Sequence, residues 1–187
     1  MAQTNVINHC LFDTAIGPCG VAWSARGLAA LQLPEKDRAA TERRLVGKAQ
    51  SSGADEPPFW LRAVIADIQR YLSGERVDFA AVAVDLDRAD PFHRKVYEAL
   101  RAVGWGATTT YGDLARQAGG SDWEATREVG QAMARNPMPL VVPCHRVLAA
   151  GNKLGGFSAY GGVVTKERLL ALEGVRLDGP APRLPGL

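Results

Sequence analysis

The chain has 187 residues, of which 47% are hydrophobic and 22% are charged, and its formal net charge is +2. This composition is typical of a globular protein and excludes a disordered or fibrous chain, and the length suffices for one full hydrophobic core or two small ones. Residues 1–90 contain 10 basic and 12 acidic residues, whereas residues 91–187 contain 12 and 8, so the second half is the better candidate for contact with a polyanion.

The first ninety residues are expected to form an α/β domain built on a small antiparallel sheet. Short apolar runs alternate with glycine-containing turns, as in a meander of hairpins. Apolar residues at helical spacing predict helices over 36–49 and 59–74, with a loop between them at 51–58. The segments expected to be strands are 8–14, 20–25, 27–33 and 79–87.

The second part of the chain is expected to be mostly helical. A polar stretch at 85–90 marks the boundary, which predicts one domain over residues 1–88 and another over residues 89–187. Two of its short helices are joined through glycines, the outline of a helix-turn-helix. The predicted helices cover 90–103, 110–120, 121–135 and 165–174.

Two of these helices carry start signals. Asp90 is a predicted N-cap, and Pro91 follows it at the first helical position. Ser121 and Glu124, three residues apart, predict a capping box at the start of the third helix of this group.

Cys144 follows a short apolar run at 140–142 that lies between Pro139 and Pro143. The prolines exclude a helix here, so the run is expected to be a buried extended segment. If the chain then turns helical, the thiol lies in a first turn, where free amide groups and the helix dipole lower its pKa. The alternative is that Cys144 is a small buried hydrophobic residue.

His145 and Glu173 are candidate partners of this thiol. Adjacent side chains do not share a face in regular structure, so a bend or a bridging water must connect His145 to Cys144. Glu173 lies in the last turn of a predicted helix, where the dipole disfavours an acid unless a specific partner holds it. A Cys–His–Glu relay would explain both placements, and the alternatives are a space-filling His and a solvated Glu.

Several motifs, in order along the chain, resemble those of the O6-alkylguanine-DNA alkyltransferases. The active-site motif of that family is matched by PCHRV at 143–147, and the segment FDTAIGPCGVAWSARGLAAL at 12–31 is similar to its small N-terminal domain. The other matching segments are TYGDLA at 110–115, REVGQAMARNP at 127–137 and the GGFS…LLALEG tail at 155–174.

This resemblance implies a ribonuclease-H-like N-terminal domain and a C-terminal domain with a winged-helix-like helix-turn-helix. It implies direct-reversal DNA repair, in which a base carrying an O6-alkyl group is flipped out of the duplex and its alkyl group moves irreversibly to Cys144. The expected partner is double-stranded DNA, bound through the minor groove. O4-alkylthymine stays open as a second substrate. The implied protein is a cytoplasmic monomer without a cofactor or a membrane partner, and cooperative assembly on DNA stays open.

The resemblance also implies roles for individual residues. Cys144 is the acceptor, His145 the base acting through water, and Glu173 fixes the tautomer of His145. Asn136 ties the active-site turn to the recognition helix, and Tyr111 hydrogen-bonds guanine N3 as the leaving group gains charge. Arg127 is expected to fill the gap left by the flipped base, and Thr126 and Arg135 are expected to contact the DNA. The residues expected to line the substrate pocket are Met133, Val147, Phe157 and Ser158.

Two other readings stay open on the sequence alone. One is a protein that binds alkylated guanine without repairing it, and the other is a thiol hydrolase that uses Cys144, His145 and Glu173. No metal is expected, because His9, Cys10 and Cys19 lack the spacing of a zinc site and a fourth ligand. Cys10 and Cys19 are instead expected to be buried.

Overall fold

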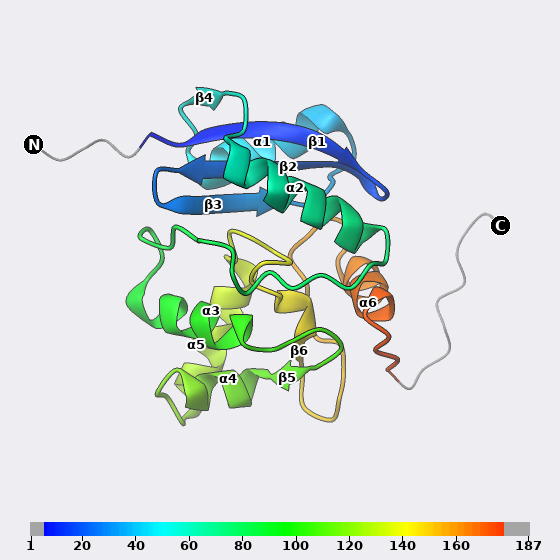
Figure 1. The fold of residues 1–187 in the computed structure, drawn as a ribbon. Helices are drawn as coiled ribbons and strands as arrows, with labels where there is room; N and C mark the ends of the chain where they lie inside the picture. The colour runs from blue at the N-terminus through cyan, green and yellow to red at the C-terminus, as the bar shows by residue number, and fades with distance from the viewer. Residues whose placement is uncertain (1–5, 178–187) are drawn as a thin grey trace, which may run out of the picture.

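A computed structural model describes residues 6–177, and we refer to residues 6–88 and 89–177 as its N-terminal and C-terminal domains. The outer parts of the two expected domains, residues 1–5 and 178–187, lie outside the described residues. The N-terminal domain holds a sheet, and the helices of the C-terminal domain lie beneath it in Figure 1. None of the helices within 6–177 is long and apolar enough to cross a membrane.

The N-terminal sheet has four strands in the order β3-β2-β1-β4. Two-residue turns join the first three strands, with Thr14 paired to Gly17 and Ser24 paired to Gly27. The fourth strand is short and runs parallel to β1, so the loop expected at 51–58 contributes an edge pairing. The strands are β1 (Asn8–Thr14), β2 (Gly17–Ser24), β3 (Gly27–Gln32) and β4 (Gly53–Ala54).

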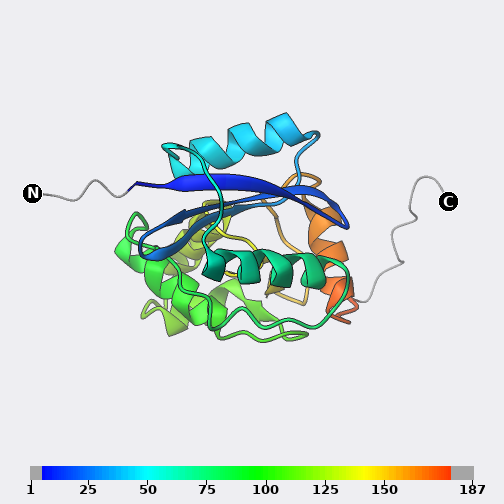
Figure 2. The same ribbon diagram turned by 45° about the horizontal axis from the view of Figure 1, so that its top comes forward.

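Two helices cover opposite faces of this sheet, α1 (Arg38–Ala49) and α2 (Phe59–Leu72) (Figure 2). Successive strand residues point to opposite faces, which explains the division. Ala22 packs on the α1 side with Leu45, and Val21 packs on the α2 side. The α2 side merges with the core of the C-terminal domain, so one hydrophobic core joins the two domains.

The C-terminal domain is built from short helices, as expected. Asp90 accepts a hydrogen bond from Phe92 N as the predicted N-cap of α3, with Pro91 at the first helical position. The helix-turn-helix pair is formed by α4 and α5. The elements are α3 (Pro91–Arg101), β5 (Thr109–Thr110), α4 (Tyr111–Gln117), α5 (Trp123–Ala134), β6 (Val147–Leu148) and α6 (Val163–Leu172), with β5 and β6 paired in parallel.

Three predictions of local structure were wrong. Residues 79–87 form no strand, because only Val84 makes a bridge, to Leu28. The N-cap of α5 is Asp122 rather than Ser121, since the Asp122 carboxylate accepts from Ala125 N. Residues 140–142 are buried but not extended. They form a turn in which Val142 N donates to Met138 O at 2.9 Å.

The outer edge of β3 is a seam covered by two later segments of the chain, one at the end of the N-terminal domain and one in the C-terminal domain. Leu28 N donates to Ala83 O at 2.9 Å, and Leu31 N donates to Pro137 O, just after α5, at 2.9 Å. These bonds occupy an edge that would otherwise be free to pair with another chain. They also fix the end of α5 against the N-terminal sheet.

Gly27 makes the close approach at this seam possible, which gives a test of the fold. Its φ is +140°, and an added Cβ would lie 2.5 Å from Ala83 O. We expect Gly27→Ala to lower the free energy of unfolding by about 1–3 kcal/mol, measured by urea titration. Gly47→Ala is the control: a Cβ there meets nothing within 4 Å, so it should raise stability by up to about 1 kcal/mol. Equal effects of the two changes would contradict this account.

Candidate active site

Cys144 begins a three-residue 3₁₀ helix, η1 (Cys144–Arg146), directly after the buried turn. Leu140 in that turn has a φ of 74°, which reverses the chain between α5 and η1. The helical turn is shorter than expected, because the chain enters β6 at Val147. Cys144 and His145 nevertheless lie at a bend of the chain. We expected a bend or a bridging water here, because adjacent side chains do not share a face in regular structure.

Asn136 holds this bend to the end of α5. Its side-chain Nδ2 donates to Val142 O at 2.7 Å, and its Oδ1 accepts from Met138 N at 3.0 Å. The side chain is buried and also hydrogen-bonds the Cys144 thiolate, which favours the charged form. Asn136 therefore connects the end of α5 to the turn that precedes Cys144.

The expected lowering of the Cys144 pKa is wrong for the isolated protein. Burial raises the pKa of this thiol, and the opposing influences of Asn136, Lys166 and Lys48 are smaller. A first turn lowers a thiol pKa through free amides and a dipole, but a helix of three residues provides little of either. Cys144 therefore rests as a thiol, and its proton must be removed for reaction.

Glu173, the C-cap residue of α6, is the centre of a buried network. It accepts hydrogen bonds from Tyr71 at 2.5 Å, His145 Nε2 at 2.8 Å, Arg146 Nη2 at 2.8 Å and Gly106 N at 3.2 Å. Burial alone would raise the pKa of Glu173, but the hydrogen bonds from His145 and Arg146 outweigh it and lower that pKa to about 2. We expected a specific partner for this acid at the end of a helix. The structure gives it four: His145, Arg146, Tyr71 and the backbone of Gly106.

The network fixes which nitrogen of His145 is free. An ionised carboxylate only accepts hydrogen bonds, so Nε2 facing Glu173 carries the proton and Nδ1 keeps its lone pair. Nδ1 is buried and has no hydrogen-bond partner among residues 6–177. Burial lowers the pKa of His145, so the ring is neutral at pH 7 and able to accept a proton at Nδ1.

A cavity of about 250 Å³ opens beside the thiol. Of the residues predicted for the substrate pocket, Met133, Phe157 and Ser158 line it, as does Tyr111 at the start of α4. Burial, and then the Cys144 thiolate, raise the pKa of Tyr111, so its hydroxyl is a hydrogen-bond donor. Val147 does not line the cavity: it is buried, and its carbonyl accepts from Lys166 Nζ at 2.5 Å.

The sequence analysis gave no role to three residues of the site. Tyr71 reaches the network from α2 of the N-terminal domain and also lies 3.1 Å from His145 Nε2. Its position on the buried face of α2 gave no sign of a polar partner. Lys166 is fully buried on α6, and desolvation lowers its pKa to about 8. Lys48 of α1 lines a second cavity at Cys144.

The residues predicted to meet DNA lie on α5 and just after it. Arg127 is exposed and packs its guanidinium 5.7 Å from the centre of the Trp123 ring. Thr126 donates to Asp122 O, and Arg135 follows the helix as its C-cap. The neighbouring Glu128 is hydrogen-bonded to His93 Nε2 of α3 at 2.7 Å, so its carboxylate is turned towards α3.

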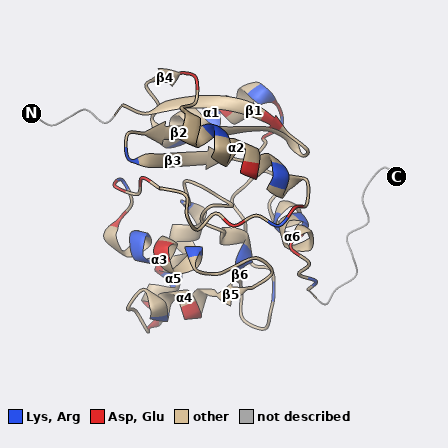
Figure 3. Cartoon of the chain, in the orientation of Figure 1, with Lys and Arg blue, Asp and Glu red and all other residues tan. Residues whose placement is uncertain are grey.

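Charge alone does not mark a binding face. Acidic and basic segments are interspersed over both domains in Figure 3. Among residues 6–177, no three His, Cys, Asp or Glu side chains are grouped so as to hold a metal ion. Cys19 is buried as expected, whereas Cys10 is only half-buried, and burial raises the pKa of these thiols to about 12 and about 11.

Comparison with known families agrees with this geometry. The family model described as "6-O-methylguanine DNA methyltransferase, DNA binding domain" matches residues 91–175. The model described as the "ribonuclease-like domain" of the same methyltransferase matches residues 7–86. The chain belongs to this family. The matched ranges cover the sheet domain and the helix-turn-helix domain, so the two-domain fold expected from the sequence is confirmed.

Relatives and solved structures agree over most of the chain. A methylated-DNA–protein-cysteine methyltransferase of Methanothermobacter thermautotrophicus is 35% identical over 86% of this chain and 81% of its own. A crystal structure of an OGT variant of Mycobacterium tuberculosis superposes with a TM-score of 0.72 at 32% identity, covering 94% of this chain and 96% of that one. The same organism's OGT in complex with DNA superposes with a TM-score of 0.70 at 32% identity, covering 89% and 92%.

Glu173→Gln tests the network. It leaves Arg146 buried without its carboxylate, so we expect the free energy of unfolding at pH 7 to fall by about 3–5 kcal/mol. The pKa of Glu173 is lowered from its ordinary 4.5 to about 2. Its contribution is therefore complete above about pH 4.5 and is lost as the pH falls towards about 2. Urea titrations of both proteins between pH 7 and pH 3 measure the difference.

The control is Glu75→Gln, which removes an exposed pair with Arg70. Exposed pairs are screened by water and salt, so this change should have little effect at any pH. A Glu173→Gln deficit that is as large at pH 3 as at pH 7 would show that the ionised carboxylate is not what stabilises the network.

Proposed function

We propose that this protein repairs alkylated DNA by transferring the alkyl group from O6 of guanine to Sγ of Cys144. The observation that carries the proposal is a buried thiol that lines a cavity of about 250 Å³ and is followed directly by a histidine held by a buried carboxylate. A base inside a duplex cannot reach such a cavity, so the damaged nucleotide must be flipped out of the stack.

The network prepares the nucleophile. His145 Nδ1 takes the proton of the Cys144 thiol through a bridging water, for which the unpartnered, buried Nδ1 is a suitable acceptor. Glu173 holds the opposite nitrogen at 2.8 Å and stabilises the imidazolium that forms. Lys166 and Lys48 lower the pKa of the thiol and so oppose the cost of its desolvation.

Transfer is a displacement at the alkyl carbon. The thiolate electron pair forms the S–C bond, the bond between that carbon and O6 breaks, and its electron pair passes to the guanine ring. Tyr111 donates a hydrogen bond to N3 as charge develops there. The guanine takes up a proton in place of the one the thiol lost, so it leaves neutral. Water does not readily cleave the thioether, so each molecule acts once, and the DNA itself supplies the alkyl group.

The helix-turn-helix provides the DNA surface in this proposal. Arg127 is exposed on α5, and its planar cation is suited to fill the space left by a flipped base. Thr126 and Arg135 lie on the same helix and at its end, where they meet the backbone through the minor groove. We propose that the protein acts in the cytoplasm as a monomer.

Mass spectrometry tests the transfer. After incubation with duplex DNA that contains O6-methylguanine, the peptide with Cys144 should carry one methyl group, and the yield should not exceed one per protein. Peptides with Cys10 and Cys19 are internal controls, because burial raises the pKa of both thiols. Cys144→Ala should bind the DNA without transfer. An unmodified Cys144 with tight lesion binding would indicate a binding protein, and repeated turnover of an ester or amide would indicate a hydrolase.

Arg127→Ala tests the role of this arginine. Loss of a cation that fills the base gap should weaken capture of an O6-methylguanine duplex by about 1–3 kcal/mol, measured by titration with fluorescent DNA. Arg116→Ala is the control, since Arg116 is an exposed arginine of α4 that pairs with Asp113. Wild-type repair rates and affinity in Arg127→Ala would exclude the assigned role.

A further inference from the structure

A second cavity, of about 270 Å³, also borders Cys144. It shares Ala134, Cys144, Phe157 and Ser158 with the first cavity. The space beside the thiol therefore extends to residues of the N-terminal domain. Its far wall is built from Gln32, Leu33, Arg44 and Lys48 of that domain.

The charged residues of this wall are all cations. Lys48 and Arg44 come from α1, Arg135 comes from the end of α5, and none of the Asp or Glu residues within 6–177 lines the cavity. Neither Lys48 nor Arg135 makes an ion pair within the part of the chain that the structure describes, and the only hydrogen bond of the Lys48 ammonium is a long one to Leu31 O, at 3.4 Å. Arg44 is already engaged, by Glu35 at 3.2 Å and Ser158 O at 2.9 Å.

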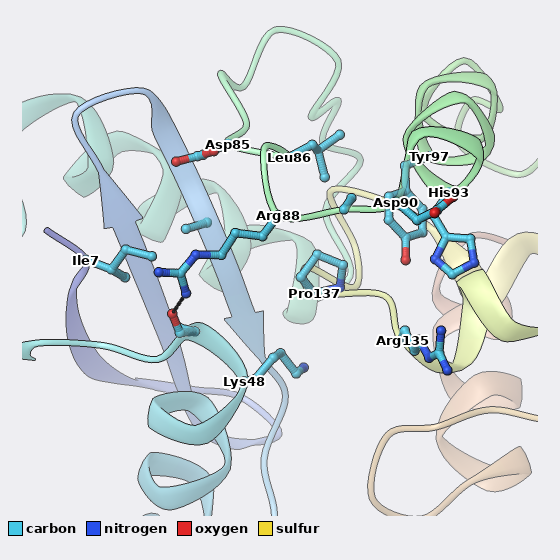
Figure 4. Close-up of a pocket in the computed structure, with 13 residues that line it drawn as sticks. Ile7, Lys48, Asp85, Leu86, Arg88, Asp90, His93, Tyr97, Arg135 and Pro137 are labelled. Atoms are coloured by element: carbon cyan, nitrogen blue, oxygen red, sulfur yellow. Dashed lines mark hydrogen bonds between the residues drawn. The ribbon is translucent and has the colours of Figure 1, made fainter. Parts of the chain in front are cut away.

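Lys48 and Arg135 also line a neighbouring cavity of about 340 Å³ between the domains. Figure 4 shows Lys48 on α1 and Arg135 on the opposite side of that cavity, with Arg88 bound to Ala49 O. The pKa of Lys48 is lowered to about 8, first by desolvation and then by the charge of Arg44. Lys48 is therefore mostly protonated at pH 7, and its charge lies near the thiol.

The geometry of displacement directs part of the substrate towards this wall. Sulfur, the attacked carbon and O6 must be nearly in line, so any further group on that carbon projects sideways from the line. When guanine occupies the first cavity, the free space beside the sulfur is the second cavity. A methyl group leaves that space unused, whereas a longer alkyl group enters it.

We propose that the second cavity receives the substituent of the alkyl group and selects O6-carboxyalkylguanines, of which O6-carboxymethylguanine is the smallest. A carboxylate there would pair with Lys48, which makes no ion pair with an acidic side chain among residues 6–177 and feels the charge of Glu35 only at longer range. Arg135 adds positive charge to the same cavity. This inference rests on the proposed transfer to Cys144. In the step, sulfur bonds the methylene carbon, the bond from that carbon to O6 breaks with its electrons passing to guanine, and guanine gains a proton in place of the one that the thiol lost. The carboxylate is unchanged, and the product is S-carboxymethylcysteine at position 144.

A pair of matched substrates isolates the charge. Duplexes with O6-carboxymethylguanine or O6-carbamoylmethylguanine differ in a carboxylate or a neutral amide of nearly the same shape. Single-turnover transfer rates are measured for both, and their ratio cancels effects on DNA binding and on the thiolate. We expect the wild type to prefer the carboxymethyl substrate at pH 7 by about tenfold or more, which corresponds to about 1.4 kcal/mol.

Variants locate the source of the preference. Lys48→Met should bring the ratio close to one, Lys48→Arg should restore it, and Arg135→Gln should reduce it. Lys36→Met is the control, because Lys36 is exposed and lines neither cavity. Equal rates for the two substrates in the wild type, or an unchanged ratio in Lys48→Met, would overturn the inference while methyl transfer still supports the proposed function. Failure to transfer methyl would instead overturn the proposed function.

Discussion

One buried carboxylate determines the geometry of the site. Glu173 ends α6 and accepts from η1 through His145 and Arg146, from α2 through Tyr71, and from the loop after α3 through Gly106 N. Burying a charge is costly unless hydrogen bonds and an opposite charge offset the cost, and these four residues provide both. Arg146 in addition donates to Val103 O. Because η1 is held from two sides in this way, the thiol at its start has a defined position.

The thiol itself is kept unreactive at rest. Burial raises its pKa, although Asn136, Lys166 and Lys48 act in the opposite direction. A thiolate exposed to solvent reacts with oxidants and electrophiles, and a protein that acts only once has no means of recovering from such losses. In the proposed mechanism a protonated thiol beside a neutral imidazole avoids these losses, since the nucleophile forms only when the thiol proton passes to His145. The same burial that raises the pKa of Cys144 lowers that of His145, which keeps the base neutral.

The sequence predicted those features that depend on local pattern. The first three strands, the helices and the Asp90 cap follow from periodicity and from well-known end signals. Local pattern also singled out Cys144, His145 and Glu173, and the resemblance assigned them roles. The strand predicted at 79–87 was wrong because alternation of apolar residues does not show whether a strand edge is available for pairing. The segment pairs with β3 at one bridge only, between Val84 and Leu28. The extended run at 140–142 was wrong because proline excludes a helix without excluding a turn. Tyr71 was missed because a tyrosine on a buried helical face is indistinguishable from a core residue until its partner is known.

The contribution of the N-terminal domain follows from the seam at β3. Leu31 N bonds Pro137 O just beyond the recognition helix, and this places the end of α1 beside the active-site turn. As a consequence, the domain without the cysteine motif supplies Tyr71 to the buried network and Lys48 to a cavity that Cys144 also lines. The motif residues can displace an alkyl group of any charge, because the attacked carbon is the same in each case. Discrimination between alkyl groups must come from side chains that face the substituent of that carbon, and in our proposal the charged ones belong largely to α1.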